Sequence, residues 1–168
     1  MPGAIGYVTH AIPVLGDKMA NGLKLRIDLC LSGGSMQVHG SCHCGQIRYE
    51  ATVDPERTTI CHCTDCQRLT GTAYRVSVPA DEGSLRMLGG EPSVYIKLAD
   101  SGARRAQAFC PNCGSPVYTY DADTPKVYIL RIGGLEERAA LVPKKQKWCR
   151  SALGWTESLA GMERREAE

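Results

Sequence analysis

The chain has 168 residues, of which 43% are hydrophobic and 23% are charged, and this length fits one domain with a core of its own. Its 20 Lys and Arg residues face 18 Asp and Glu residues, and the net charge of +2 is too small to indicate a nucleic-acid or membrane partner. No apolar run reaches the roughly 18 residues of a spanning helix and the first residues do not resemble a secretory signal, so we expect a cytoplasmic protein with reduced thiols.

Residues 1–35 differ from the rest of the chain. Six glycines and two prolines interrupt weak apolar runs there, which favours a poorly ordered N-terminal extension. We place the working domain at residues 36–157 and a charged C-terminal tail at 158–168. Two short helices are expected, one directly after Cys63 and one beginning at Ser158.

From residue 46 onward the sequence is typical of short strands. Alternating apolar residues predict strands over 46–52, 74–78, 94–98 and 117–120, and β-forming residues fill 126–132. Turn sequences rich in Asp, Gly and Pro separate these runs. The predicted fold class is all-β, a sandwich or folded sheet with little helix.

Seven of the nine cysteines gather in three blocks, which are GSCHCG at 40–45, CHCTDC at 61–66 and FCPNCG at 109–114. Cysteines separated by one residue seldom bridge each other but readily share a metal ion, so metal is favoured over disulfides. The remaining two have no predicted metal role. Cys30 lies in the N-terminal extension, and Cys149 is expected to be a small core residue.

The blocks suggest two metal sites, one closed and one open. The closed set pairs the first and third blocks, through Cys42, Cys44, Cys110 and Cys113. Four thiolates form the usual structural zinc site, and a positive φ at Gly114 would let the CxxCG turn close around the ion. The open set is Cys61, Cys63 and Cys66, which leaves one tetrahedral position free, as in catalytic zinc sites.

The sequence leaves other arrangements open. Cys42 and Cys44 could instead join Cys61 and Cys63, and iron or an iron–sulfur cluster is the rival to zinc. His43 and His62 each sit between two cysteines and are expected to point away from the metal, while His10 and His39 are expected on the surface. Polar residues after the triad could line its site or cap a helix end; they are Gln67, Arg68 and Thr70.

Taken together, the cysteine blocks resemble those of the glutathione-dependent formaldehyde-activating enzyme family, which also includes centromere protein V. The matching segments are GSCHCG at 40–45, CHCTDCQRLTG at 61–71, FCPNCGSPV at 109–117 and RIGGLEERAALVP at 131–143. The resemblance implies a tent-like folded β-sheet with two zinc ions. It also implies that Cys42, Cys44, Cys110 and Cys113 are structural ligands, and that Cys61, Cys63 and Cys66 are catalytic ligands.

The same resemblance implies a carbon–sulfur lyase reaction, the reversible addition of the glutathione thiol to formaldehyde to give S-hydroxymethylglutathione. An open zinc could hold the thiol as thiolate or polarise the aldehyde oxygen. We favour the thiolate, because three cysteine thiolates leave the ion with about one negative charge by formal count.

The expected partners are therefore a small-molecule thiol and an aldehyde, with no nucleic acid and no membrane. Glutathione carries two carboxylates that need cationic groups, and nothing in the sequence selects among the available arginines, Arg68, Arg75, Arg104 and Arg131. A non-catalytic zinc module that binds another protein is the alternative, since no acid, base or substrate clamp is identifiable from the sequence.

Overall fold

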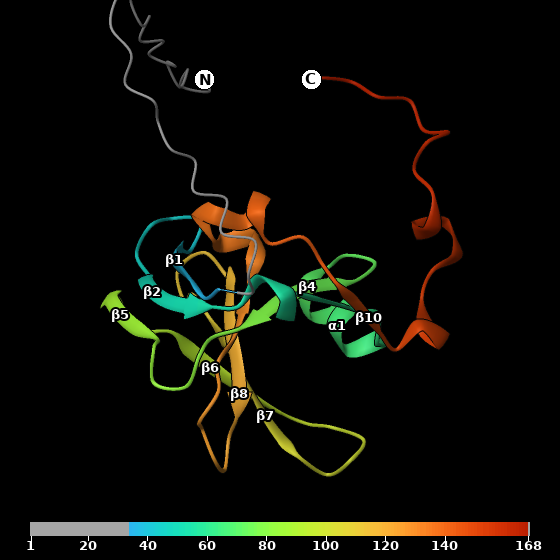
Figure 1. Ribbon diagram of the computed structural model, residues 1–168. Coiled ribbons are helices and arrows are strands. Elements are labelled where there is room, and N and C mark those ends of the chain that lie inside the picture. The colour runs from blue at the N-terminus through green and yellow to red at the C-terminus, as the bar shows by residue number, and fades with distance from the viewer. Residues whose placement is uncertain (1–33, 168) are drawn as a thin grey trace, which may run out of the picture.

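The computed structural model describes residues 34–167 (Figure 1). The predicted N-terminal extension, except for its last two residues, falls outside this range, as do Cys30 and His10. Within the described part, no helix has both the length and the apolar character required to cross a membrane.

Strands dominate the described residues and form two sheets. The first sheet is antiparallel and has three strands in the order β1 (Met36–Ser41), β2 (Arg48–Val53) and β5 (Arg86–Gly89). The second has seven strands in the order β10 (Lys145–Lys147), β3 (Thr59–Cys61), β4 (Arg75–Pro79), β9 (Ile129–Arg131), β8 (Pro116–Asp121), β7 (Arg104–Phe109) and β6 (Ser93–Leu98). Only β10 and β3 pair in parallel. The predicted all-β folded sheet is confirmed.

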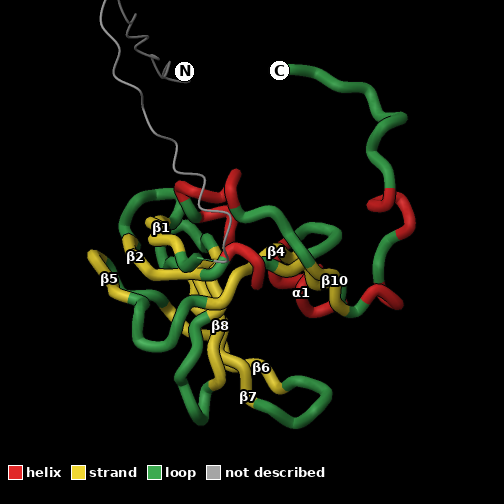
Figure 2. Tube along the Cα trace, in the orientation of Figure 1, coloured by secondary structure: helices red, strands yellow, loops and turns green. Residues whose placement is uncertain are grey.

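Helical structure is short. Between residues 34 and 167, the α-helix α1 (Thr64–Thr70) follows β3, and five short 3-10 helices lie in connections. Two of these, η2 (Ile132–Gly134) and η3 (Glu136–Ala140), follow β9. The others are η1 (Pro55–Arg57), η4 (Cys149–Ser151) and η5 (Gly154–Glu157). In Figure 2, β1, β2 and β5 lie to the left of β8, and β4, α1 and β10 lie to its right.

The core is built from the inward faces of both sheets. Alternation in β2 buries Tyr49, Ala51 and Val53, and these residues join Val78 of β4 and Leu130 of β9 in one apolar cluster. A period of two places alternate side chains on one face, so the sequence pattern of β2 translates directly into burial. The cluster holds the two sheets together and fixes the cysteine loops at their ends.

The predicted strands over 46–52, 74–78, 94–98 and 117–120 are confirmed as β2, β4, β6 and β8, and the run over 126–132 contributes only β9. The helix after Cys63 is confirmed as α1. The helix predicted from Ser158 is wrong, because residues 158–167 form only bends and turns. That segment is exposed along its length and has only two large apolar residues, Leu159 and Met162, so no apolar stripe holds a helix against the domain.

Candidate functional site

Four cysteines from two distant loops converge beside the first sheet. Their sulfur atoms all lie within 4.8 Å of one another, and the four are Cys42, Cys44, Cys110 and Cys113. Cys42 and Cys44 follow β1, whereas the other two follow β7. The loop between β1 and β2 is therefore joined to the loop between β7 and β8, as the pairing of the first and third blocks predicted.

Each loop closes with a glycine whose backbone N–H bonds back to the first cysteine, across three residues in one loop and four in the other. Gly45 N donates to Cys42 O at 3.0 Å, and Gly114 N donates to Cys110 O at 2.9 Å. Both glycines have positive φ, 75° and 73°, a conformation that glycine adopts without a Cβ penalty. Each turn leaves its two cysteines directed at a common centre.

The sulfur spacing fits a tetrahedral zinc ion. A Zn–S distance of about 2.3 Å places two ligand sulfurs about 3.8 Å apart. Cys42 Sγ lies 3.5 Å from Cys44 Sγ, which lies 3.8 Å from Cys110 Sγ. Disulfide sulfurs would be about 2.05 Å apart, and all eight described cysteines are free. The donor set and its spacing therefore suit zinc.

Hydrogen bonds prepare this group for a cation. The hydroxyl of Ser115 and nearby backbone N–H groups lower the pKa of Cys113 to about 5. Burial raises the pKa of Cys110 to about 11. Burial alone would also raise the pKa of Cys42, but hydrogen bonds from Ile47 N–H and Cys44 bring it below its usual range. Thiols that keep protons in so small a space would lose them to a divalent ion.

The second group consists of Cys61, Cys63 and Cys66, whose sulfur atoms also lie within 4.8 Å of one another. Cys61 ends β3, and Cys63 is the N-cap of α1, where its sulfur accepts from Cys66 N at 3.4 Å. Positions three residues apart at the start of a helix lie on one side of it. Strand end and helix start therefore direct the three sulfurs to one point.

The thiols of Cys61 and Cys66 share a hydrogen bond that shifts the pKa values of both. A hydrogen bond from Cys66 lowers the pKa of Cys61 to about 5, against the opposing effect of burial. The pKa of Cys66 is raised, first by its bond to Cys61 and then by burial. Two thiolates repel each other in a poorly solvated place, so the group keeps a proton that a cation would displace. Three sulfurs at this spacing also suit zinc.

The histidines between the cysteines stay out of both groups. His43 is exposed, and its backbone N–H donates to Ser115 Oγ at 3.1 Å. His62 also points away from the cysteines but is buried, with its ring 2.8 Å from Gln146 Oε1 and edge-on to Tyr74. Within residues 34–167, no histidine, aspartate or glutamate joins either cysteine group.

A cavity of about 610 Å³ opens beside the three-cysteine group. Six cationic residues line it, against two acidic ones. The cations are Arg75, Lys97, Arg105, Arg131, Lys147 and Arg150. Lys97 forms an ion pair with Asp65, and Arg105 lies 3.6 Å from Asp121. Strand register places Arg75 and Lys147 on either side of Cys61, so the sheet itself positions positive charge next to the thiols.

Two of the four arginines considered as partners for a carboxylate lie beside the three-cysteine group. Arg75 and Arg131 line the cavity and are each 6% exposed, whereas Arg104 pairs with Asp123 and Arg68 is exposed. Burial lowers the pKa of Arg131 to about 9, with repulsion from Arg75 adding to the effect. Both arginines sit on strands in otherwise apolar runs, a signal of an inward-facing charge.

The structure decides between the two roles left open for Gln67 and Thr70, and it corrects the prediction for Cys149. The side-chain amide of Gln67 is hydrogen-bonded to the backbone, because its Nε2 donates to His62 O and to Ser151 O at 2.9 Å each. Thr70 lines a different cavity. Cys149 is exposed and not a core residue, because Trp148 before it adopts a positive φ of 60° and the backbone turns outward there. Trp148 and Arg150 instead reach the rim of the three-cysteine cavity.

Comparisons with known proteins identify the family and the fold of this chain. A model of the family described as glutathione-dependent formaldehyde-activating enzyme matches residues 37–151. A curated protein of Halomonas elongata, provisionally named for the same activity, is 29% identical over 99 residues, which is 55% of this chain. The chain spans 61% of that relative's length. A solved structure of a Rhodobacter sphaeroides protein matches 67% of this chain and 100% of its own, with a TM-score of 0.51 and 22% identity, which indicates a shared fold.

Proposed function

Because the chain belongs to the glutathione-dependent formaldehyde-activating enzyme family, we propose that it is a zinc-dependent carbon–sulfur lyase that adds a thiol to a small aldehyde. Glutathione and formaldehyde are the proposed substrates, by the family's description. The resemblance read from the cysteine motifs is thereby confirmed at the level of the family.

The observation that carries the proposal is the open character of the three-cysteine group. Its sulfurs converge without a fourth Cys, His, Asp or Glu among residues 34–167, and they face a cavity. Catalytic zinc sites keep one position for substrate, whereas structural sites fill all four. We assign Cys61, Cys63 and Cys66 as ligands of the catalytic zinc.

The four-cysteine group is assigned the structural zinc. Cys42, Cys44, Cys110 and Cys113 would fill all four positions of a tetrahedral ion. Their loops belong to different sheets, so the ion would stabilise the junction between the sheets. Two zinc ions per chain follow from the two assignments.

Zinc at the triad would supply a soft Lewis acid that holds the incoming thiol as its thiolate. The cations around Cys61 would favour negative charge at the same place, and Lys147 and Arg150 at the rim would attract the carboxylates of glutathione. In the forward reaction the thiol would release its proton to water, a C–S bond would form between the thiolate sulfur and the carbonyl carbon as the C=O π bond breaks, and the oxygen would take a proton back from water. The reverse reaction returns that proton.

Exchange NMR of glutathione with formaldehyde tests the proposal. Zinc-loaded protein should accelerate formation of the hemithioacetal, and Cys66→Ser should lower the rate at least about 100-fold, since the ion loses a ligand. Cys149→Ser is the matched control, because this thiol is exposed and lies outside both groups; it should keep the full rate. Equal activity of wild type and Cys66→Ser would refute the assignment.

A non-catalytic zinc module remains the competing function. It predicts that the protein binds metal but gives no acceleration with any thiol and aldehyde pair. Zinc content measured on the same samples separates the two outcomes. Two equivalents with no acceleration above the uncatalysed rate would favour the module.

A further inference from the structure

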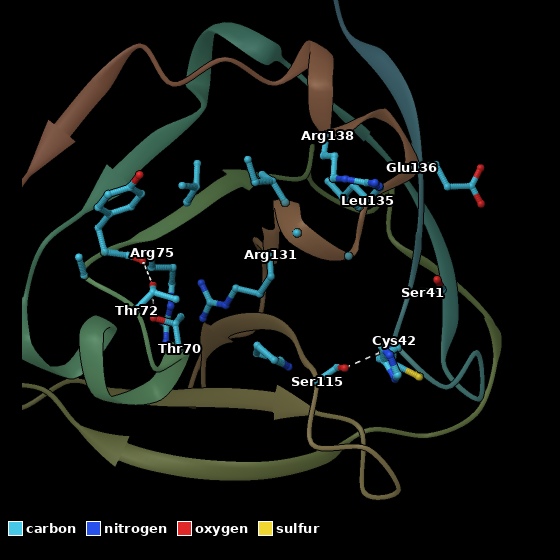
Figure 3. Close-up of a pocket in the computed structure, with 18 of the residues that line it drawn as sticks. Ser41, Cys42, Thr70, Thr72, Arg75, Ser115, Arg131, Leu135, Glu136 and Arg138 are labelled. Carbon is cyan, nitrogen blue, oxygen red and sulfur yellow. Dashed lines mark hydrogen bonds between the residues drawn. The ribbon is translucent and has the colours of Figure 1, made fainter. Parts of the chain in front are cut away.

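Two buried arginines lie between the cavity of the triad and a second cavity of about 750 Å³ (Figure 3). Arg75 of β4 and Arg131 at the end of β9 line both cavities. They share a face of the sheet, because Arg131 pairs with Ser77, two residues beyond Arg75. In Figure 3 the Arg131 side chain extends across the cavity toward Arg75.

The partners of the two guanidinium groups are few and neutral. Arg75 Nη1 and Arg131 Nη2 both donate to Oε1 of Gln107, at 3.3 and 3.0 Å. The Gln107 amide is held in this orientation because its Nε2 donates to Thr119 Oγ1 at 2.9 Å. The Nε atoms of both arginines are buried and have no partner. Neither arginine takes part in any ion pair of residues 34–167.

Buried unpaired charge is costly, and arginine does not relieve that cost by losing its proton at neutral pH. Three acidic residues line the two cavities, and none forms an ion pair with either arginine; one of them, Asp100, is exposed. Asp65 is bound by Lys97, and Glu136, the carboxylate that lines the second cavity, points away from Arg131 in Figure 3. A triad holding zinc contributes about one negative charge by formal count. Counting only the two buried guanidinium groups and this unit leaves about one positive charge, which matches one monoanion; the other four cations of the triad's cavity are less buried.

We propose that Arg75 and Arg131 bind the carboxylate of a small organic acid whose apolar part lies in the second cavity. Tyr74, Ile132 and Leu135 line that cavity and supply the apolar contacts. A guanidinium pair suits the two oxygens of a carboxylate. A phosphate dianion fits less well, because it exceeds the charge to be balanced and the cavity wall is largely apolar. The charge count rests on the proposed zinc at the triad, whereas the anion site itself does not require the thiol addition.

Calorimetry with hexanoate tests the proposal at constant ionic strength on zinc-loaded protein. Hexanoate should bind, acetate should bind at least fivefold more weakly for want of apolar contact, and hexanol should not bind. Inorganic phosphate should bind more weakly than hexanoate. Absence of hexanoate binding at millimolar concentration, or equal binding of hexanol, would overturn the proposal.

Variants locate the site. Gln107→Glu places a permanent carboxylate between the two guanidinium groups and should weaken hexanoate binding at least tenfold. Arg131→Lys keeps the positive charge but loses the paired N–H donors of the guanidinium group, so it should also weaken hexanoate binding severalfold. Arg105→Met is the matched control, because this residue lines the triad's cavity but already lies beside Asp121; its affinity should stay within twofold. Equal effects of Gln107→Glu and Arg105→Met would contradict the site.

The source of the carboxylate is resolved by competition. S-methylglutathione carries the carboxylates of glutathione but no free thiol. If it displaces hexanoate, the arginine pair receives a carboxylate of the thiol substrate. If it does not, the ligand is a separate acid. Both results keep the anion site, and the loss of hexanoate binding in Gln107→Glu remains its test, whatever the outcome of the thiol-addition assay.

Discussion

Both cysteine groups offer sulfur ligands to a metal ion, but they are built from different parts of the chain. The four-cysteine group is made from two loops that lie far apart in sequence, since Cys44 and Cys110 are separated by 66 positions. It joins the two sheets. The three-cysteine group spans six residues, 61–66, on one strand end and one helix start. The first therefore closes a long loop of chain, and the second closes almost none.

This difference predicts at which site the free energy of metal binding contributes to folding. Ligands that are distant in sequence convert metal binding into folding free energy. Ligands within one local turn are brought together by β3 and α1 whether or not metal is bound. The surroundings differ too, because the cavity beside the local group is lined by all three of its cysteines and by six cationic residues, whereas the second cavity reaches only Cys42 of the four-cysteine group. We expect the first group to hold the fold and the second to be exchangeable.

The largest expected contrast is between Cys110→Ser and Cys66→Ser. Cys110→Ser should lower the free energy of unfolding by on the order of 5 kcal/mol, because it opens the tie between the sheets. Cys66→Ser should cost only about 1–2 kcal/mol. Urea unfolding of zinc-loaded proteins measures both. Equal losses would mean that the triad is as structural as the four-cysteine group.

Chelation should separate the two ions in time. Zinc at the triad should leave at least about tenfold faster than zinc held by four sulfurs, because it has fewer protein ligands and opens into a cavity. Stopped-flow chelation with a coloured zinc indicator, followed in parallel by circular dichroism, gives the order. The strand signal should persist through the first equivalent and fall with the second. A single phase with simultaneous unfolding would contradict the comparison.

Ser115→Ala should act on the four-cysteine group alone. The hydroxyl lies 3.2 Å from Cys113 Sγ and accepts from His43 N, so it links the two loops. Its loss should cost about 1 kcal/mol of stability and about tenfold in affinity for the structural ion. Competitive metal titration should show no change at the triad. Weakened binding at the triad would indicate that the two groups are coupled.

The smallest effect is a pH-dependent one in the β1 to η3 contact. Hydrogen bonding to Glu137 raises the pKa of His39 above 6.5. Burial would raise the pKa of Glu137, but the hydrogen bond from His39 keeps that pKa below 4.5. The pair is charged between these values, and its stabilisation fades as pH rises through the raised pKa of His39. His39→Gln should therefore lower the urea midpoint more at pH 5.5 than at pH 8.5. The reverse order would exclude the ion pair.

Much of this fold could be predicted from alternation. β2 alternates apolar and polar residues and buries the apolar set, as its sequence indicates. β10 could not be predicted this way, since Lys145–Lys147 is wholly polar and is held by pairing with β3. β6 shows the opposite failure. Its Val94, Ile96 and Leu98 alternate correctly but remain exposed, because β6 is the edge of its sheet.

The candidate site divides in the same way. Cysteine spacing carries information about local convergence, so CxCxxC predicted that three sulfurs could share an ion, but spacing alone left open whether Cys42 and Cys44 would join them. The cations around it were not, because Arg75 and Lys147 reach Cys61 through strand pairing across 14 and 86 residues of chain, from β4 and β10. The buried arginine pair depends on three strands whose register the sequence does not reveal. Only the folded sheet places Gln107 between the guanidinium groups.

Cadmium NMR of the metal-substituted protein tests the central claim most directly, since each resonance reports the sulfur count of its own ion. We predict two resonances, one typical of four sulfur ligands and one of three sulfurs with oxygen, and a shift of only the second toward the four-sulfur region when glutathione is added. Two four-sulfur resonances in the free protein, or no shift with saturating glutathione, would show that the triad is closed to a thiol.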